Sequence, residues 1–164
     1  MKELPARKTI RLKGYDYSSN GAYFITICVK DGHEMLGKIV VGDAPLRVPY
    51  CRLSEYGKFV EVQIQKTSVV YPGISVDKYI VMPNHIHMIA VVADETRRGA
   101  SPTKAVIPQI VQSIKSMTTK HFEFNLWHRS YHDHIIRNEE EYRRIWQYID
   151  GNPARWEEDR YFIK

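Results

Sequence analysis

The sequence has little cysteine, no hydrophobic run of membrane-spanning length and no internal repeat. Its two cysteines, Cys28 and Cys51, lie far apart and lack spacing partners, so neither a zinc knuckle nor a disulfide framework is implied. No apolar stretch approaches the roughly 20 residues that cross a bilayer. The stretch from Met1 to Pro5 lacks the apolar segment of a secretion signal. These absences favour a reduced, cytoplasmic protein without a membrane partner.

The chain is long and apolar enough to bury a core. It has 164 residues, of which 43% are hydrophobic and 12% aromatic, so we expect residues 1–164 to form a single domain. The net charge is +5, which favours polyanionic partners, because each Lys or Arg that meets a phosphate releases a condensed counterion. Residues 1–20 form a basic arm, for which a solvated terminus and a DNA-contacting role both remain open. Its candidate contacts are Arg7, Lys8, Arg11, Lys13 and Tyr15.

The hydrophobic patterns predict an α+β domain with a largely antiparallel sheet. Strands are predicted at residues 22–29, 35–41, 76–82 and 85–92. Asp31-Gly32 predicts a turn that joins the first two strands, and residues 42–51 are expected to form a loop. Three amphipathic helices are predicted: the first from a cap at Ser54 to about Thr67, the second around Ile107–Met117, and the last between a cap at Asn138 and a stop at Gly151 and Pro153.

His85 and His87 are the first candidate functional residues. Residues two apart in a strand project from the same face, so both imidazoles point the same way while Ile86 faces the core. The strand is otherwise almost wholly apolar, so two polar rings there need partners. One divalent metal ion would satisfy both rings, although two histidines that merely decorate a strand are common.

Two other histidine patterns point elsewhere. His132-Asp133-His134 repeats the spacing, but the central carboxylate suits an exposed strand or loop better than a buried metal platform, so we expect a DNA-contacting or structural element. Nucleotide hydrolases of the histidine-triad type carry a third histidine two positions further on. That position holds Ile89, which excludes this reading.

Tyr148 is the candidate nucleophile among 11 tyrosines. It lies on the flank of the last helix's apolar stripe, with Arg144 one turn before it and Asn152 one turn after it. A phenol placed there can be held by packing while its oxygen faces a cleft; an ordinary border tyrosine would look the same. Pro153 biases Asn152 away from helical dihedrals, so this alignment is expected to be approximate.

Five segments of the sequence, and their order along the chain, resemble those of the REP-associated tyrosine transposases. These are relatives of insertion-sequence transposases that act on single-stranded DNA. The resemblance runs from about residue 7 to residue 156. The matching segments are Arg11–Tyr17, Gly21–Thr26, Met82-Pro83-Asn84-His85-Ile86-His87-Met88-Ile89, Leu126–Asn138 and Tyr148–Pro153.

The resemblance implies a ferredoxin-like fold and metal-dependent cleavage and transfer of single-stranded DNA beside a hairpin of the repeated extragenic palindrome type. Tyr148 would form a 5′-phosphotyrosine, while His85, His87 and Asn152 would bind Mg²⁺ or Mn²⁺. The related insertion-sequence transposases use a glutamine where this chain has Asn152. The resemblance also implies a bacterial, nucleoid-associated protein, acting as a monomer or homodimer. Candidate DNA contacts beyond the arm are Lys115, Lys120 and Arg144.

Two alternatives stay open from the sequence. A DNA-binding module that has lost catalysis would keep the basic surface, although every proposed catalytic position holds a competent residue. A replication-initiator-like nickase would use the same chemistry, but the larger size and additional motifs typical of that class are missing.

Overall fold

The computed structural model describes residues 21–93 and 106–164. The basic arm, with Arg7, Lys8, Arg11, Lys13 and Tyr15, lies outside the described residues. In chain order, the helices and strands are β1 (Gly21–Cys28), η1 (Lys30–Gly32), β2 (Gly37–Val41), β3 (Pro49–Leu53), α1 (Glu55–Val70), β4 (Ile74–Val81), β5 (His85–Val92), α2 (Val106–Phe122), β6 (His132–Ile136), α3 (Glu139–Gly151) and η3 (Pro153–Glu158).

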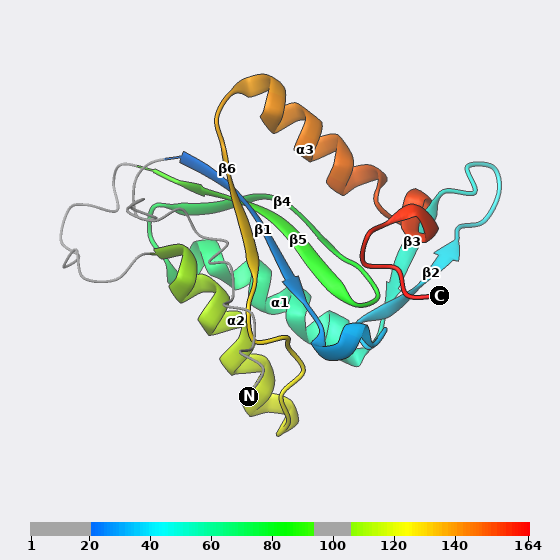
Figure 1. Ribbon diagram of the computed structural model, residues 1–164, viewed down its shortest axis with the longest axis horizontal. Helices are drawn as coiled ribbons and strands as arrows, with labels where there is room; N and C mark the ends of the chain where they lie inside the picture. Colours follow the sequence, from blue (N-terminus) through cyan, green and yellow to red (C-terminus); the bar gives the residue numbers. More distant parts are fainter. Residues whose placement is uncertain (1–20, 94–105) are drawn as a thin grey trace, which may run out of the picture.

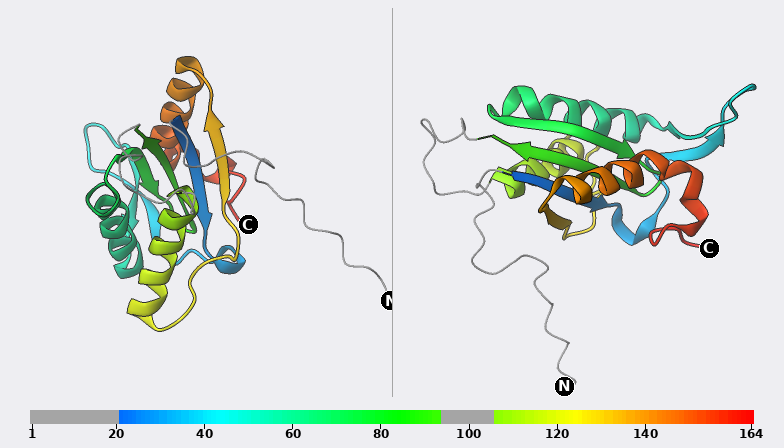
Figure 2. Two further views of the ribbon diagram at one scale, coloured as in Figure 1. Left: turned by 90° about the vertical axis from the view of Figure 1, so that its left-hand side faces the viewer. Right: turned by 90° about the horizontal axis from the view of Figure 1, so that it is seen from above.

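The main sheet has the strand order β4-β5-β1-β6, and all its pairings are antiparallel. Helices α1 and α2 cover one face, while α3 and the C-terminal segment lie on the other (Figures 1 and 2). The predicted α+β class with an antiparallel, ferredoxin-like sheet is therefore confirmed. Among the described residues no helix is both long and apolar enough to span a membrane.

Side-chain alternation along β1 and β5 separates the two faces. Ile25 and Ile27 of β1 and Ile86 of β5 have no exposed surface and pack toward α1 and α2. Phe24 and Ile89 instead belong to the cluster under α3. Because both faces of the two central strands are covered, β5 is apolar almost throughout, and its two histidines are exceptions that need a reason.

The predicted hairpin between the first two strands is wrong. Strand β2 pairs with β3 in a separate two-stranded sheet, while Asp31 and Gly32 form a short 3-10 turn with positive φ angles. The reason is that β5 and β6 occupy both edges of β1 and leave no room for β2. The expected loop at residues 42–51 is also shorter, since Pro49 opens β3, where a missing N–H is tolerated at the start of an edge strand.

The helix caps follow the sequence. Ser54 accepts a hydrogen bond from the Gly57 amide at the start of α1, and Asn138 accepts one from the Glu141 amide at the start of α3. Glu141 in turn accepts a hydrogen bond from the Arg137 amide, one residue before the cap. These bonds satisfy amides that the first helical turn leaves unpaired, and they fix where α3 begins relative to β6.

Gly57 allows α1 to approach the chain that precedes β2. A Cβ atom at this position would collide with the Leu36 carbonyl and press on the Leu53 side chain. The Leu36 atoms that the Cβ would meet belong to the backbone, which cannot move aside as a flexible side chain would. A glycine is therefore required for this contact between α1 and the segment from Leu36 to Leu53.

We predict that Gly57→Ala lowers the free energy of unfolding by about 1–3 kcal/mol, because the added methyl group overpacks a rigid contact. Gly151→Ala is the matched control, since a Cβ there meets nothing within 4 Å. It should leave stability unchanged or raise it by up to about 1 kcal/mol, as alanine favours the helix. Urea denaturation of both variants measures the difference; equal stabilities would contradict the contact.

Candidate metal and nucleophile site

The strand pairing places two histidines under the end of α3. In the register of β1 with β5, Thr26 lies opposite His87 and Cys28 lies opposite His85. Both histidines are buried, with exposures of 0% and 1%, and their ring centroids are 4.4 Å apart. The prediction that they share a face while Ile86 points into the core is confirmed.

Both imidazoles are neutral at neutral pH. Burial lowers the pKa of His85 to about 4, against the opposing effects of the Asp159 carboxylate and of Asn152. Burial also holds the pKa of His87 well below its usual range, and the neighbouring His85 and Arg160 act in the same direction. Neutral rings offer nitrogen lone pairs, which is the form that binds a metal.

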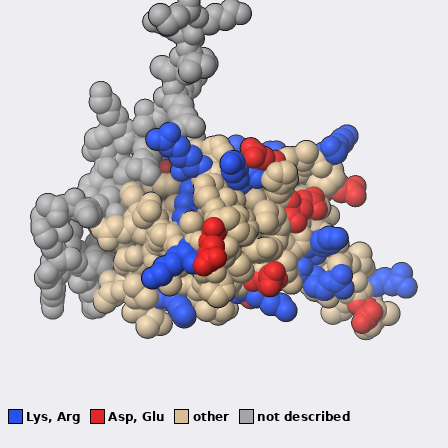
Figure 3. Space-filling view, turned by 90° about the horizontal axis from the view of Figure 1, so that it is seen from below, with Lys and Arg blue, Asp and Glu red and all other residues tan. Residues whose placement is uncertain are grey.

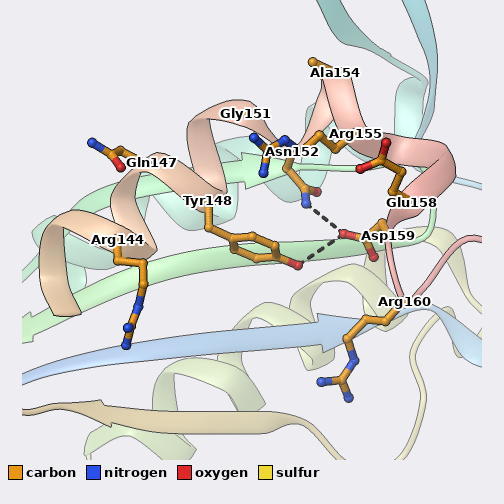
Figure 4. Close-up of a pocket in the computed structure, with 10 residues that line it drawn as sticks. All are labelled: Arg144, Gln147, Tyr148, Gly151, Asn152, Ala154, Arg155, Glu158, Asp159 and Arg160. Carbon is orange, nitrogen blue, oxygen red and sulfur yellow. Dashed lines mark hydrogen bonds between the residues drawn. The ribbon is translucent and has the colours of Figure 1, made fainter.

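Tyr148 reaches this pair from α3. Its hydroxyl lies 3.4 Å from His87 Nε2. Figure 4 shows the hydrogen bond that the same hydroxyl donates to Asp159 Oδ2, at 3.2 Å. The side chain is held by an edge-to-face contact with Phe24, while the residue as a whole stays 39% exposed. The packed ring and the partial exposure of the residue agree with the predicted position of Tyr148 on the flank of the apolar stripe.

Asn152 lies at the end of α3, fully within the site. Its dihedrals are helical, with φ −60° and ψ −42°, so the expectation that Pro153 would turn it away from helical geometry is wrong. Pro153 starts the 3-10 helix η3 instead, where its fixed φ and missing N–H are tolerated. Asn152 Nδ2 donates to Asp159 Oδ2 at 2.7 Å. This bond leaves Asn152 Oδ1 turned away from the carboxylate.

Asp159 is the residue that the sequence did not reveal. Asp159 directly follows η3, where the chain turns back toward the sheet. One oxygen of its carboxylate accepts hydrogen bonds from both Tyr148 and Asn152, and the other accepts one from the Tyr161 amide. One ligand atom each of His85, His87 and Asp159 lie within 4.8 Å of one another, a geometry that can hold a metal ion. The acidic run that contains Asp159 gave no indication in the sequence that this carboxylate lies against the sheet. The apolar residues that follow it indicated that the segment packs, but not where.

Two buried acceptors in the site have no hydrogen-bond partner among the described residues. They are His85 Nε2 and Asn152 Oδ1. A buried polar atom without a partner costs roughly 1–3 kcal/mol. A single cation bound beside the Asp159 carboxylate would give both atoms a partner. The residues present thus fit a divalent metal with imidazole and oxygen donors.

The three predicted DNA contacts in the described part of the chain lie on opposite faces of the sheet. Arg144 lines a cavity of about 770 Å³ together with Tyr148, Asn152 and two further arginines, Arg155 and Arg160 (Figure 4). Lys115 and Lys120 are on α2, on the sheet face away from Tyr148. Lys115 donates to the carbonyls of residues 128, 129 and 130, which ties α2 to the chain before β6.

His132 and His134 lie on the edge strand β6, as an exposed element was expected to. His132 is opposite Thr26 and lines a second cavity of about 470 Å³, which Tyr148 and His87 also line. His134 instead pairs with Glu141 at 2.6 Å and links β6 to α3. Tyr148 and Arg160 therefore line both cavities.

The fold is shared with a protein of known structure. The chain has the fold of a REP-associated tyrosine transposase whose structure was solved bound to a REP hairpin: the TM-score is 0.61 and the identity 20%, over 84% of this chain and 68% of that one. The resemblance inferred from the sequence is thus confirmed at the level of the fold. No protein-family model matches the chain.

A relative in Haemophilus influenzae, described as an uncharacterized protein, is 30% identical over 175 aligned positions, which cover 96% of this chain and 93% of the relative. The chain belongs to the same family as that Haemophilus protein.

We predict that Asp159→Asn lowers the pKa of Tyr148 in the metal-free protein. That pKa is raised to about 12, first by burial and then by the Asp159 charge and hydrogen bond. Removing the charge should move it part of the way back toward 10, since the burial remains. Ultraviolet titration of the phenolate, taken as a difference from the same protein carrying Tyr148→Phe, measures the shift. Glu158→Gln, in the same cavity, is the control and should leave the pKa unchanged; an unaltered value in Asp159→Asn would contradict the contact.

Proposed function

We propose that the protein is a metal-dependent single-stranded DNA endonuclease and strand transferase of the single-tyrosine type, acting beside DNA hairpins. The observation that carries the proposal is the convergence of a partly exposed tyrosine, two buried imidazoles and a carboxylate from separate elements. The fold shared with a hairpin-bound REP-associated tyrosine transposase supports the substrate class.

Tyr148 is the nucleophile in this proposal. Its oxygen attacks the scissile phosphorus, a Tyr148–phosphate bond forms, and the bond from phosphorus to the 3′ oxygen breaks. The phenol loses its proton and the leaving oxygen gains one, so the products are a 5′-phosphotyrosine and a free 3′-hydroxyl. Because the ester keeps the energy of the broken bond, a second 3′-hydroxyl can displace Tyr148 without a nucleotide cofactor.

The ion would be held by His85, His87 and Asp159, with Asn152 Oδ1 directed to the same place. Mg²⁺ or Mn²⁺ suits a site that mixes imidazole with carboxylate and amide oxygens. When bound, such an ion polarises the scissile phosphate and favours loss of the phenol proton. The latter effect matters here because burial and Asp159 together make Tyr148 a weak acid in the metal-free protein.

Arginines supply the positive charge for the DNA backbone in this proposal. Arg144, Arg155 and Arg160 line the cavity beside Tyr148, together with Glu158 and Asp159. The three guanidinium groups can pair with phosphate oxygens. By contrast, Figure 3 shows basic and acidic side chains interspersed on the face that it draws. The net charge alone therefore does not locate the DNA, and the arginine-lined cavity is the stronger candidate. The arm residues Arg7, Lys8, Arg11, Lys13 and Tyr15 lie outside the described residues and remain proposed contacts of the hairpin, with stacking on an unpaired base as the proposed role of Tyr15.

Mutation of Tyr148 tests the chemistry. Incubated with Mn²⁺ and a hairpin oligonucleotide drawn from palindromes that flank the gene, the protein should form a covalent DNA adduct visible by denaturing electrophoresis. Tyr148→Phe should form none, because the phenyl ring has no attacking oxygen.

The matched control is Tyr142→Phe, six residues earlier on α3, whose hydroxyl instead donates to Asp77 on β4. This variant should form the adduct at the wild-type rate. An adduct in Tyr148→Phe would reject Tyr148 as nucleophile. Hairpin binding without cleavage by the wild-type protein, at any Mn²⁺ or Mg²⁺ concentration, would favour the catalytically inactive DNA-binding alternative.

A further inference from the structure

The orientation of the His85 ring is fixed by its neighbour in sequence. Asn84 is 2% exposed, and its Nδ2 donates to two backbone carbonyls, those of Gly32 at 3.1 Å and Tyr161 at 2.7 Å. Carbonyl oxygens only accept, so the amide nitrogen must face them and Oδ1 must face His85. That oxygen is 2.9 Å from His85 Nδ1. Since Oδ1 also only accepts, the ring proton belongs on Nδ1 and the lone pair on Nε2.

The outer nitrogen of the His87 ring has a hydroxyl beside it. His87 Nδ1 is 2.7 Å from Thr26 Oγ1, and both groups are buried. A hydroxyl can donate and accept, so this contact fits either tautomer of His87.

Thr26 can hold on His87 the tautomer that Asn84 imposes on His85. If Thr26 Oγ1 accepts from His87 Nδ1, the proton is on Nδ1 and the lone pair is on Nε2, the nitrogen that lies 3.4 Å from the Tyr148 hydroxyl. Both rings then turn an Nε2 lone pair toward the same site.

We propose that Asn84 and Thr26 are positioning residues that hold the proton of each imidazole on Nδ1, so that both Nε2 lone pairs face one metal ion. This inference rests on the proposed metal-dependent function and names residues that do not touch the ion. Carboxylates, carbonyls or hydroxyls that bind the outer nitrogen of a metal-binding histidine fix its tautomer and its angle, and losing one weakens metal affinity by about 10–100-fold.

The tautomers can be measured in the metal-free, full-length wild-type protein. Long-range ¹H–¹⁵N correlation spectra distinguish a protonated Nδ1 from a protonated Nε2, and assignment follows from His85→Gln and His87→Gln. We expect both rings to be protonated at Nδ1 at neutral pH. A proton on Nε2 of either ring would overturn the proposal for the residue bound to that ring, whether or not any variant folds.

Substitution of Thr26 tests the effect on binding. Thr26→Val keeps the shape and removes the hydroxyl, while Thr26→Ser keeps the hydroxyl. By titration calorimetry with Mn²⁺ alone, Thr26→Val should bind about 10–100-fold more weakly than wild type, and Thr26→Ser should bind close to wild type. His87 in metal-free Thr26→Val should populate both tautomers. Wild-type affinity in Thr26→Val, or equal weakening in Thr26→Ser, would reject the role of the hydroxyl.

The outcome of these tautomer and binding experiments can be distinguished from the outcome of the DNA-cleavage test. If Tyr148 forms no adduct while the tautomers and Mn²⁺ affinities follow the prediction, the function is wrong and the positioning residues stand. If the adduct forms but Thr26→Val binds Mn²⁺ as wild type does, the function stands and the positioning role is wrong.

Discussion

The pairing of β1 with β5 is the constraint on which the site depends. It sets Thr26 opposite His87 and Cys28 opposite His85, so that a shift of one residue would send both imidazoles into the core and bring Ile86 to the site. The apolar side chains on the opposite face prevent that shift, because Ile25, Ile27 and Ile86 have no exposed surface. The hydrophobic core therefore keeps two polar rings in place on the other side of the same strands.

The rest of the site is brought to this pair by α3 and by the segment that follows it. Helix α3 delivers Tyr148 and Asn152 one turn apart, and η3 returns the chain so that Asp159 reaches both. Asp159 has opposing effects in this arrangement. It completes a possible set of metal ligands, but without an ion its charge raises the pKa of Tyr148, the proposed nucleophile. On this account, metal binding and activation of the nucleophile are coupled through one carboxylate.

Local patterns in the sequence predicted three of the four strands of the main sheet, its helices and the first two candidate metal ligands. The alternation around Ile86 placed His85 and His87 on one face, and Ser54 and Asn138 marked where two helices begin. Helical spacing related Tyr148 to Asn152, although Pro153 misled the expected geometry of Asn152. These features depend on residues within a few positions of each other, for which the geometry of strands and helices is sufficient.

What the sequence could not predict depends on contacts between distant segments. The return of Asp159 to the sheet depends on how η3 packs, and the pairing of β2 with β3 depends on β1 having no free edge. The hydrogen bonds of Asn84 with Gly32 and Tyr161 join three segments far apart in the chain. The placement of Lys115 and Lys120 on the far face depends on which side of the sheet α2 covers.

The central claim is that one divalent ion binds between the two imidazoles and beside Tyr148. The most direct measurement is an anomalous difference map from a crystal of the full-length protein grown with Mn²⁺. The account predicts one strong peak within coordination distance of His85 Nε2, His87 Nε2 and an Asp159 oxygen. A map without a peak at the histidine pair, in crystals that hold Mn²⁺ elsewhere, would contradict it.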